Sequence, residues 1–212
     1  MAGAGRVIPS ATVRLEGALC VPAGAKGIVL FAHGSGSSRH SPRNNYVADV
    51  LKKAGLATLL IDLLTRDEDI DYETRFDINL LTARLKTATD FLMEDDRTKK
   101  LKIGYFGAST GAAAALQASV SAGDAIGAIV SRGGRPDLAE RYLPKVTAPT
   151  LLIVGGRDDV VIELNRRAYN LLRAEKELVI VPGATHLFEE PGALEEAAKL
   201  AAAWFKKYLT PL

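Results

Sequence analysis

The stretch that most constrains this chain is a strand-like run, a turn of small residues and an alanine-rich segment, in that order. Residues 103–106 are an apolar run with β-branched and aromatic members, and residues 110–120 are typical of a helix. Gly107, Ser109 and Gly111 lie between the two. A strand that reverses into a helix at once leaves no room for Cβ atoms, which explains both glycines. Ser109 is therefore predicted to stand exposed on a sharp, strained turn.

The Gly-x-Ser-x-Gly pattern in this setting is typical of a nucleophile elbow. The peptide N–H groups that open the following helix would point to the place where an oxyanion develops. The alternative is that five small residues only make a tight connection in a parallel sheet. The hypothesis of a nucleophilic serine therefore needs a base and an acid elsewhere in the chain.

The rest of the chain alternates buried strands with segments of helical periodicity. Residues 12–21 mix β-branched and apolar residues around Glu16-Gly17 and predict a hairpin or two short edge strands. This alternation predicts one α/β domain over residues 1–212, with a mainly parallel sheet covered by helices on both faces. The expected strands are 27–32, 56–61, 103–106, 125–130, 149–154 and 178–181, and the expected helices include 45–54, 81–92, 110–120, 161–172 and 194–205.

Composition narrows the function classes. A length of 212 residues suits one domain, and 48% hydrophobic with 25% charged residues is ordinary for a globular protein. A net charge of +2 indicates neither nucleic acid nor an anionic membrane as partner. Cys20 is the only cysteine, which excludes an internal disulfide and a cysteine-built metal site. No apolar run approaches the ~20 residues of a spanning helix, so we expect a cytoplasmic protein without a metal or other cofactor.

Chemically useful residues follow four of the expected strands. Ser109, Asp158 and His186 each come shortly after a strand, and His33 with Gly34 follows the strand 27–32. In a parallel sheet the ligand site lies outside the carboxyl ends of the strands. A serine hydroxyl needs an imidazole to accept its proton, and the imidazole needs a carboxylate to orient it. The pattern therefore predicts that these side chains meet at one edge of the sheet.

Four motifs, GIVLFAHGSG, GYFGASTG, PTLLIVGGRDDVV and VPGATHLF, cover nearly the whole chain and resemble those of α/β hydrolases, above all the dienelactone hydrolase family. The resemblance implies that Ser109 is the nucleophile, Asp158 the orienting acid and His186 the general base. It also implies an oxyanion hole made by the backbone N–H groups of Thr110 and Ser35.

Two departures from the family pattern bear on the substrate. Dienelactone hydrolases proper carry a cysteine nucleophile, whereas serine stands here, so a dienelactone substrate does not follow. The segment 133–147, where many α/β hydrolases insert a cap, is short, which predicts an open cleft without a cap domain. Asp159 is an alternative to Asp158 as the acid. The acidic segment 65–75 is either a solvated loop or a lid.

Further side chains are candidates for substrate binding. Arg132 and Arg135 follow a strand and would hold a carboxylate, as in an acidic ester or lactone, or else pair with local acids such as Asp137. His40 is either a surface residue or a substrate contact. His33 is expected to brace the turn that follows it.

These observations favour a serine hydrolase that cleaves a small ester, lactone or thioester, with no prediction of its oligomeric state. A dinucleotide site is a second hypothesis, based on the glycines of residues 34–38 and on Asp62 at the end of the next strand. It fits poorly, because Arg39 stands where that fingerprint requires Gly or Ala. A third hypothesis is a ligand receptor without catalysis on the same scaffold.

Overall fold

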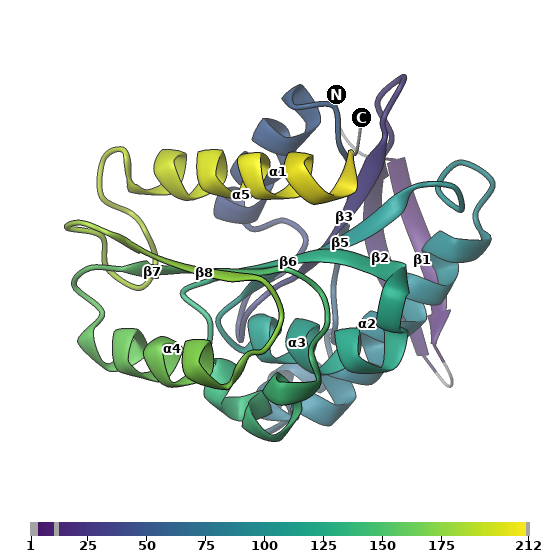
Figure 1. Cartoon of the computed structure of the whole chain (residues 1–212). Helices are drawn as coiled ribbons and strands as arrows, with labels where there is room; N and C mark the ends of the chain where they lie inside the picture. Colours follow the sequence, from purple (N-terminus) through teal and green to yellow (C-terminus); the bar gives the residue numbers. More distant parts are fainter. Residues whose placement is uncertain (1–3, 11–12, 211–212) are drawn as a thin grey trace.

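The computed structural model, which describes residues 4–10 and 13–210, contains one eight-stranded sheet of order β1-β2-β4-β3-β5-β6-β7-β8 (Figure 1). Strands β3 to β8 are mutually parallel, while β2 runs antiparallel to both β1 and β4. This arrangement confirms the predicted α/β class and the mainly parallel sheet. The strands are β1 (Ala4–Ser10), β2 (Val13–Cys20), β3 (Gly27–Ala32), β4 (Ala57–Ile61), β5 (Lys102–Ala108), β6 (Ile126–Arg132), β7 (Thr150–Gly155) and β8 (Lys176–Val181).

Helices cover both faces of the sheet (Figure 1). One face carries α1 (Pro42–Lys53) and α5 (Ala193–Leu209). The other carries α2 (Ile78–Glu94), α3 (Thr110–Ala122), α4 (Asp159–Leu171) and the 3₁₀ segment η4 (Pro136–Lys145). Three short 3₁₀ turns complete the connections, η1 (Glu68–Ile70), η2 (Thr74–Phe76) and η3 (Gly123–Ala125).

The central strands are apolar throughout because each of their faces packs against helices. Leu30 of β3 and Tyr105 of β5 belong to the core beneath α2 and α3. Phe31 and Phe106, the next residue along each strand, belong to the core beneath α1 and α5, where their ring centroids lie 4.9 Å apart. A strand that alternates between two buried faces has no polar side, which explains the continuous apolar runs in the sequence.

The prediction for residues 12–21 is wrong. Val13–Cys20 forms a single strand, β2, that pairs with β1 along its length, and Thr12 lies outside the described residues. Gly17 sits inside β2, where a Cβ atom would lie 3.1 Å from Leu59 Cδ1. Glu16-Gly17 therefore marks a close approach between strands and not a turn.

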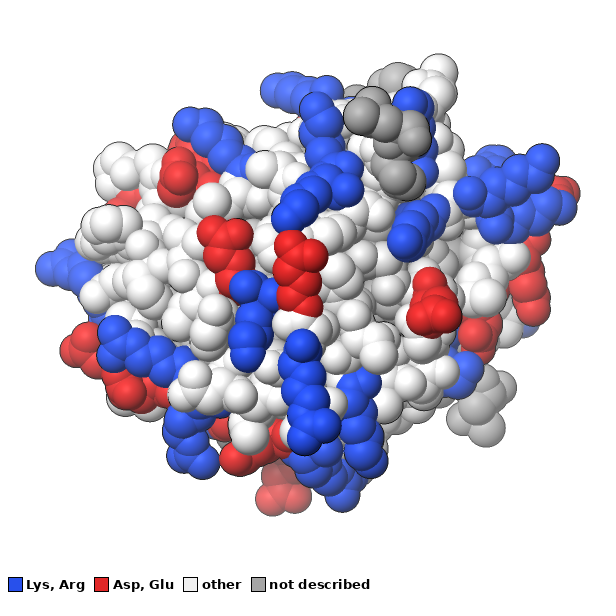
Figure 2. Space-filling view, viewed as in Figure 1, with Lys and Arg blue, Asp and Glu red and all other residues white. Residues whose placement is uncertain are grey.

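The surface mixes charges of both signs. Lys and Arg side chains lie scattered among Asp and Glu on the face seen in Figure 2, which therefore does not form a single basic surface. Within residues 4–10 and 13–210, no helix combines the length and apolar character needed to cross a membrane.

The C-terminal end of α5 packs directly against glycines on three neighbouring strands. A Cβ atom on Gly104 of β5 would lie 2.7 Å from Phe205 Cε1 and 2.9 Å from Leu209 Cδ1. Leu209 would likewise meet a Cβ on Gly27 of β3 at 2.7 Å and one on Gly127 of β6 at 2.8 Å. These glycines let the closing helix lie directly on the sheet.

We expect Gly104→Ala to lower the free energy of unfolding by about 1–3 kcal/mol, because the added methyl group overpacks a closed core. Gly5→Ala is the control, since nothing lies within 4 Å of a Cβ at that position of β1. It should change stability by at most about 0.5 kcal/mol. Urea denaturation measures both, and equal losses would contradict the packing argument.

Candidate active site

Ser109 occupies a strained turn between β5 and α3, with φ 50° and ψ −122°. A residue with a Cβ atom adopts such a conformation only where its surroundings hold it there. The Ser109 N–H donates to the carbonyl of Arg132 (3.4 Å), and the Ser109 carbonyl accepts from the N–H of Arg135 (3.1 Å). The backbone of the turn is thus held from both sides by the segment that ends β6.

The two glycines of the turn have the steric role that the sequence predicted. A Cβ atom on Gly111 would lie 2.1 Å from the carbonyl oxygen of Ala32 and 2.5 Å from that of His33. One on Gly107 would lie 2.4 Å from Cα of Ala112. These neighbours are main-chain atoms, which cannot swing aside as a side chain can, so larger residues would force the turn apart.

The predicted acid and base are in contact. His186 follows β8, Asp158 precedes α4, and the distance from His186 Nδ1 to Asp158 Oδ2 is 2.6 Å. The Asp158 side chain is 16% exposed and that of His186 is 38% exposed, so the carboxylate lies behind the ring. Asp159, the alternative acid, is the exposed first residue of α4.

Ser109 and His186 line one cavity of about 170 Å³. Ser35 and Arg132, both predicted as site residues, line it as well. Arg43 and Asn44 of the first turn of α1 also face it, and the sequence analysis named neither of them individually as a site residue. The signal was present, because Ser41 followed by Pro42 is a helix start, yet the helix was expected only from residue 45. Because α1 begins at Pro42, its first turn lies beside the turn at residues 34–37.

One predicted oxyanion donor already has a partner. The backbone N–H of Ser35 donates to the side-chain hydroxyl of Thr110 at 3.1 Å, and Thr110 is 1% exposed. The Thr110 side chain therefore ties the 33–36 turn to the start of α3. The sequence analysis assigned a role only to the backbone N–H of Thr110.

His33 braces the turn, as predicted. Its Nδ1 lies 2.9 Å from the carbonyl of Gly34, and its Nε2 accepts the N–H of Leu63 at 3.0 Å. A nitrogen facing a carbonyl carries the proton and one facing an N–H does not, so the ring is neutral in a single tautomer. Burial lowers the pKa of His33 below its usual value.

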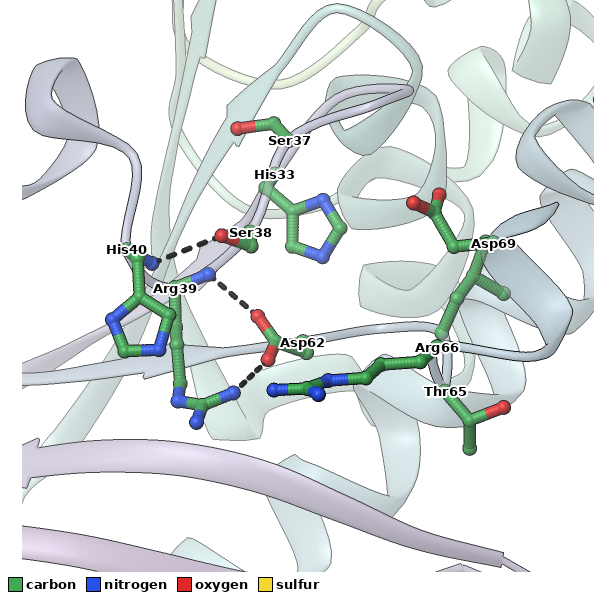
Figure 3. Close-up of a pocket in the computed structure, with 10 residues that line it drawn as sticks. His33, Ser37, Ser38, Arg39, His40, Asp62, Thr65, Arg66 and Asp69 are labelled. Atoms are coloured by element: carbon green, nitrogen blue, oxygen red, sulfur yellow. Dashed lines mark hydrogen bonds and ion pairs between the residues drawn. The ribbon is translucent and has the colours of Figure 1, made fainter.

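His40 lies in a neighbouring pocket of about 240 Å³ and not in the lining of the Ser109 cavity (Figure 3). Asp62, one of the residues on which the dinucleotide hypothesis was based, accepts the backbone N–H of Arg39 at 2.5 Å and pairs with its guanidinium. Ser37 lines both pockets. The two hollows therefore meet at the turn that follows β3.

The two candidate arginines have different environments. Arg135 forms two hydrogen bonds to Asp137, at 2.9 and 2.8 Å, and is not among the residues that line the cavity. Of the two alternatives for Arg135, the structure therefore confirms pairing with a local acid. Arg132 belongs to β6, which extends to this residue instead of ending at Val130, and it is 7% exposed.

The Arg132 guanidinium lies between two rings, with its central carbon 5.9 Å from the Phe106 centroid and 5.8 Å from that of Phe188. Its Nε and Nη1 have no hydrogen-bond partner among the described residues. Burial lowers the pKa of Arg132 from its usual value to about 10, so it stays protonated at neutral pH. A shift of that size costs the fold roughly 3 kcal/mol.

Metal ligands do not gather here. In the part of the chain that the structure describes, no three His, Cys, Asp or Glu side chains lie close enough to hold one ion.

The comparisons with known proteins agree with the geometry. The model of the dienelactone hydrolase family matches residues 15–210. A dienelactone hydrolase from Anabaena variabilis is 58% identical, with a TM-score of 0.95 over 98% of each chain. The esterase domain of a Rhodothermus marinus protein is 18% identical and has the same fold, with a TM-score of 0.79 over 99% of this chain and 100% of that one. The fold is that of an α/β hydrolase. The chain belongs to the dienelactone hydrolase family.

A longer relative carries a different name. A Mycobacterium tuberculosis protein, provisionally named a phosphoribosyl transferase, is 58% identical over 197 residues, which are 93% of this chain and 44% of that protein. The present chain thus spans less than half the length of this relative. That name describes a whole protein of which the match is one part.

His33 should make the protein less stable in mild acid. Above pH 6.5 the ring is neutral in both states, and below it the unfolded chain binds a proton that the folded ring resists. Stability is then lost as pH falls, by up to about 1.4 kcal/mol per pH unit from this group. We expect His33→Gln to lose less stability than the wild type between pH 6.5 and 5.5 in urea titrations. His40→Gln, at an exposed position, should behave as the wild type, and parallel pH profiles for all three proteins would contradict the assignment.

Proposed function

We propose that this protein is a serine hydrolase that cleaves a small ester, lactone or thioester through an acyl-enzyme on Ser109. The observation that carries the proposal is that a serine on a strained turn shares one cavity with a histidine that a carboxylate holds at 2.6 Å. Membership of a hydrolase family supports the reaction class. No component of the proposal requires a cofactor.

The proposed reaction starts with Oγ of Ser109 attacking the carbonyl carbon while His186 takes its proton. Because Asp158 engages Nδ1, the nitrogen available for this transfer is Nε2. The tetrahedral intermediate then collapses and expels an alkoxide or thiolate, which takes from His186 the proton that came from Ser109. Water attacks the resulting acyl ester, His186 accepts its proton, and the carboxylic acid leaves as Ser109 regains its hydrogen.

The negative charge of the intermediate would be stabilised at the start of α3. The N–H of Thr110 opens this helix, where the helix dipole favours an anion. The N–H of Ser35 is the second proposed donor, and it also donates to the Thr110 hydroxyl. We infer that this N–H is shared between the hydroxyl and the oxyanion as the intermediate forms.

The first test is the reactivity of Ser109. We expect the wild type to gain one adduct with a fluorophosphonate, measured by intact mass, and to hydrolyse p-nitrophenyl acetate. Ser109→Ala should gain no adduct and lose turnover by a factor on the order of 10⁴ or more. Ser121→Ala, which removes a hydroxyl near the far end of α3, is the control. An unlabelled wild type would sink the proposal in favour of a receptor without catalysis.

The second test separates the two aspartates. Asp158→Asn should lower kcat by a factor of about 10³–10⁴, because the imidazole loses the group that sets its tautomer. Asp159→Asn should remain within a few fold of the wild type. Steady-state kinetics with p-nitrophenyl acetate measure both variants, and a cost at Asp159 equal to that at Asp158 would refute our choice of acid.

A further inference from the structure

Arg132 places a positive charge in the cavity that contains the proposed nucleophile. It is the last residue of β6 and lies opposite Ala108, the residue before Ser109, on the neighbouring strand. Its carbonyl accepts the Ser109 N–H, and its side chain lines the same cavity as Ser109 and His186. The backbone of Arg132 is thus anchored beside Ser109, and its side chain points to the side of the sheet that carries α1 and α5.

Among the described residues, no acidic side chain pairs with this arginine. It is 7% exposed, its Nε and Nη1 have no partner among the described residues, and the charged group that shifts its pKa is Arg43, which has the same sign. A buried cation without an anion costs stability, and an apolar side chain of similar size would fill the space at lower cost. The two phenyl rings offset only part of that cost. Stability alone therefore does not explain a charge at this position.

The rest of the cavity is also suited to an anion. Among the described residues that line it there is no Asp or Glu, while Arg43 supplies a second cation. Arg43 and Asn44 belong to the first turn of α1, a helix of 12 residues whose dipole is positive at this end. Glu189 pairs with Arg43 at 2.9 Å, but its side chain is 61% exposed and lies outside the lining. The paired arginine sits toward solvent and the unpaired one lies inside.

We propose that Arg132 binds an anionic group of the substrate, a carboxylate or a phosphate, within a few bonds of the carbonyl that Ser109 attacks. The proposal deepens the proposed hydrolase function and rests on it for the identity of the reacting group. Arg132 then acts in recognition, by supplying N–H donors to the anion and orienting the carbonyl toward Ser109. Substrates of this class are half-esters, half-thioesters or lactones that carry an acidic group.

The test uses three p-nitrophenyl esters of equal chain length and identical leaving group, those of pentanoate, glutarate and 4-phosphonobutanoate. Spontaneous hydrolysis is measured without protein and subtracted. For the wild type we expect kcat/KM for an anionic ester at least ten-fold above that for the pentanoate. A preference for glutarate identifies a carboxylate, and a preference for 4-phosphonobutanoate identifies a phosphate.

Arg132→Met should bring that ratio to one or below. Arg141→Met is the control, because it removes the same charge from a surface residue that stacks on Tyr142, and it should keep the ratio of the wild type. A wild type without preference for either anionic ester, or an Arg132→Met variant with the ratio intact, would overturn the proposal.

A binding measurement separates failure of this proposal from failure of the proposed reaction. In Ser109→Ala, inorganic phosphate or glutarate should raise the unfolding temperature at constant ionic strength, and adding Arg132→Met should remove the rise. If no ester is hydrolysed but this shift appears, the anion site stands without the hydrolase reaction. If esters are hydrolysed without any shift or anion preference, the site is refuted and the reaction stands.

The unfolding temperature of Arg132→Met distinguishes a role in substrate recognition from a role in packing. Without ligand, Arg132→Met should unfold at a temperature no lower than the wild type, since it removes an unpaired buried charge. A loss of several degrees together with an unchanged substrate ratio would assign Arg132 to packing between the two rings and overturn a role in recognition.

Discussion

The crowding of main-chain atoms behind Ser109 is the constraint on which the rest of the site depends. Gly111 lies so close to the carbonyls of Ala32 and His33 that no side chain fits between them. The start of α3 is therefore pressed against the end of β3, which brings the 33–36 turn beside Ser109. The strain in the Ser109 backbone follows from this contact, and it is held by hydrogen bonds from the segment after β6. Packing at the edge of the sheet thus sets the geometry of the reacting group.

Charged side chains around the site are of two kinds, those with an oppositely charged partner and one without. We assign a structural role to the first kind and a role in substrate recognition to the second. Asp158 is matched by His186, Asp62 by Arg39 and Arg135 by Asp137. These pairs hold loops and rings in place, since each charge finds its counterpart within the protein. Arg132 differs, because it is buried and no acidic side chain in the described part of the chain pairs with it. A protein tolerates such a cost at a site where a ligand completes the interaction.

The segment that follows β6 covers the sheet in place of a cap domain. Residues 136–145 form η4, which packs against α3 and α4 on the face opposite α1 and α5. None of residues 133–145 lines the cavity, whereas Arg132, the last residue of β6, does. Access is instead bordered by the turn after β3, by the first turn of α1 and by Leu187. Substrate selection therefore depends on short connections whose positions are set by the strands that precede them.

The sequence by itself determined the alternation of strands and helices, the elbow at Ser109 and the residue types needed for the proposed chemistry. Hydrophobic periodicity and the steric need for glycine are local properties, so they can be read without a fold. Only the tertiary structure decided which aspartate meets His186 and which arginine enters the cavity. Arg132 follows Val130 by two residues in β6, so its side chain points to the same face of the sheet, the one that carries α1 and α5. Because the sequence predicted that the strand ends at Val130, the direction of the Arg132 side chain could not be predicted. Whether a charge has a partner depends on side chains far away in sequence, and only folding brings those together.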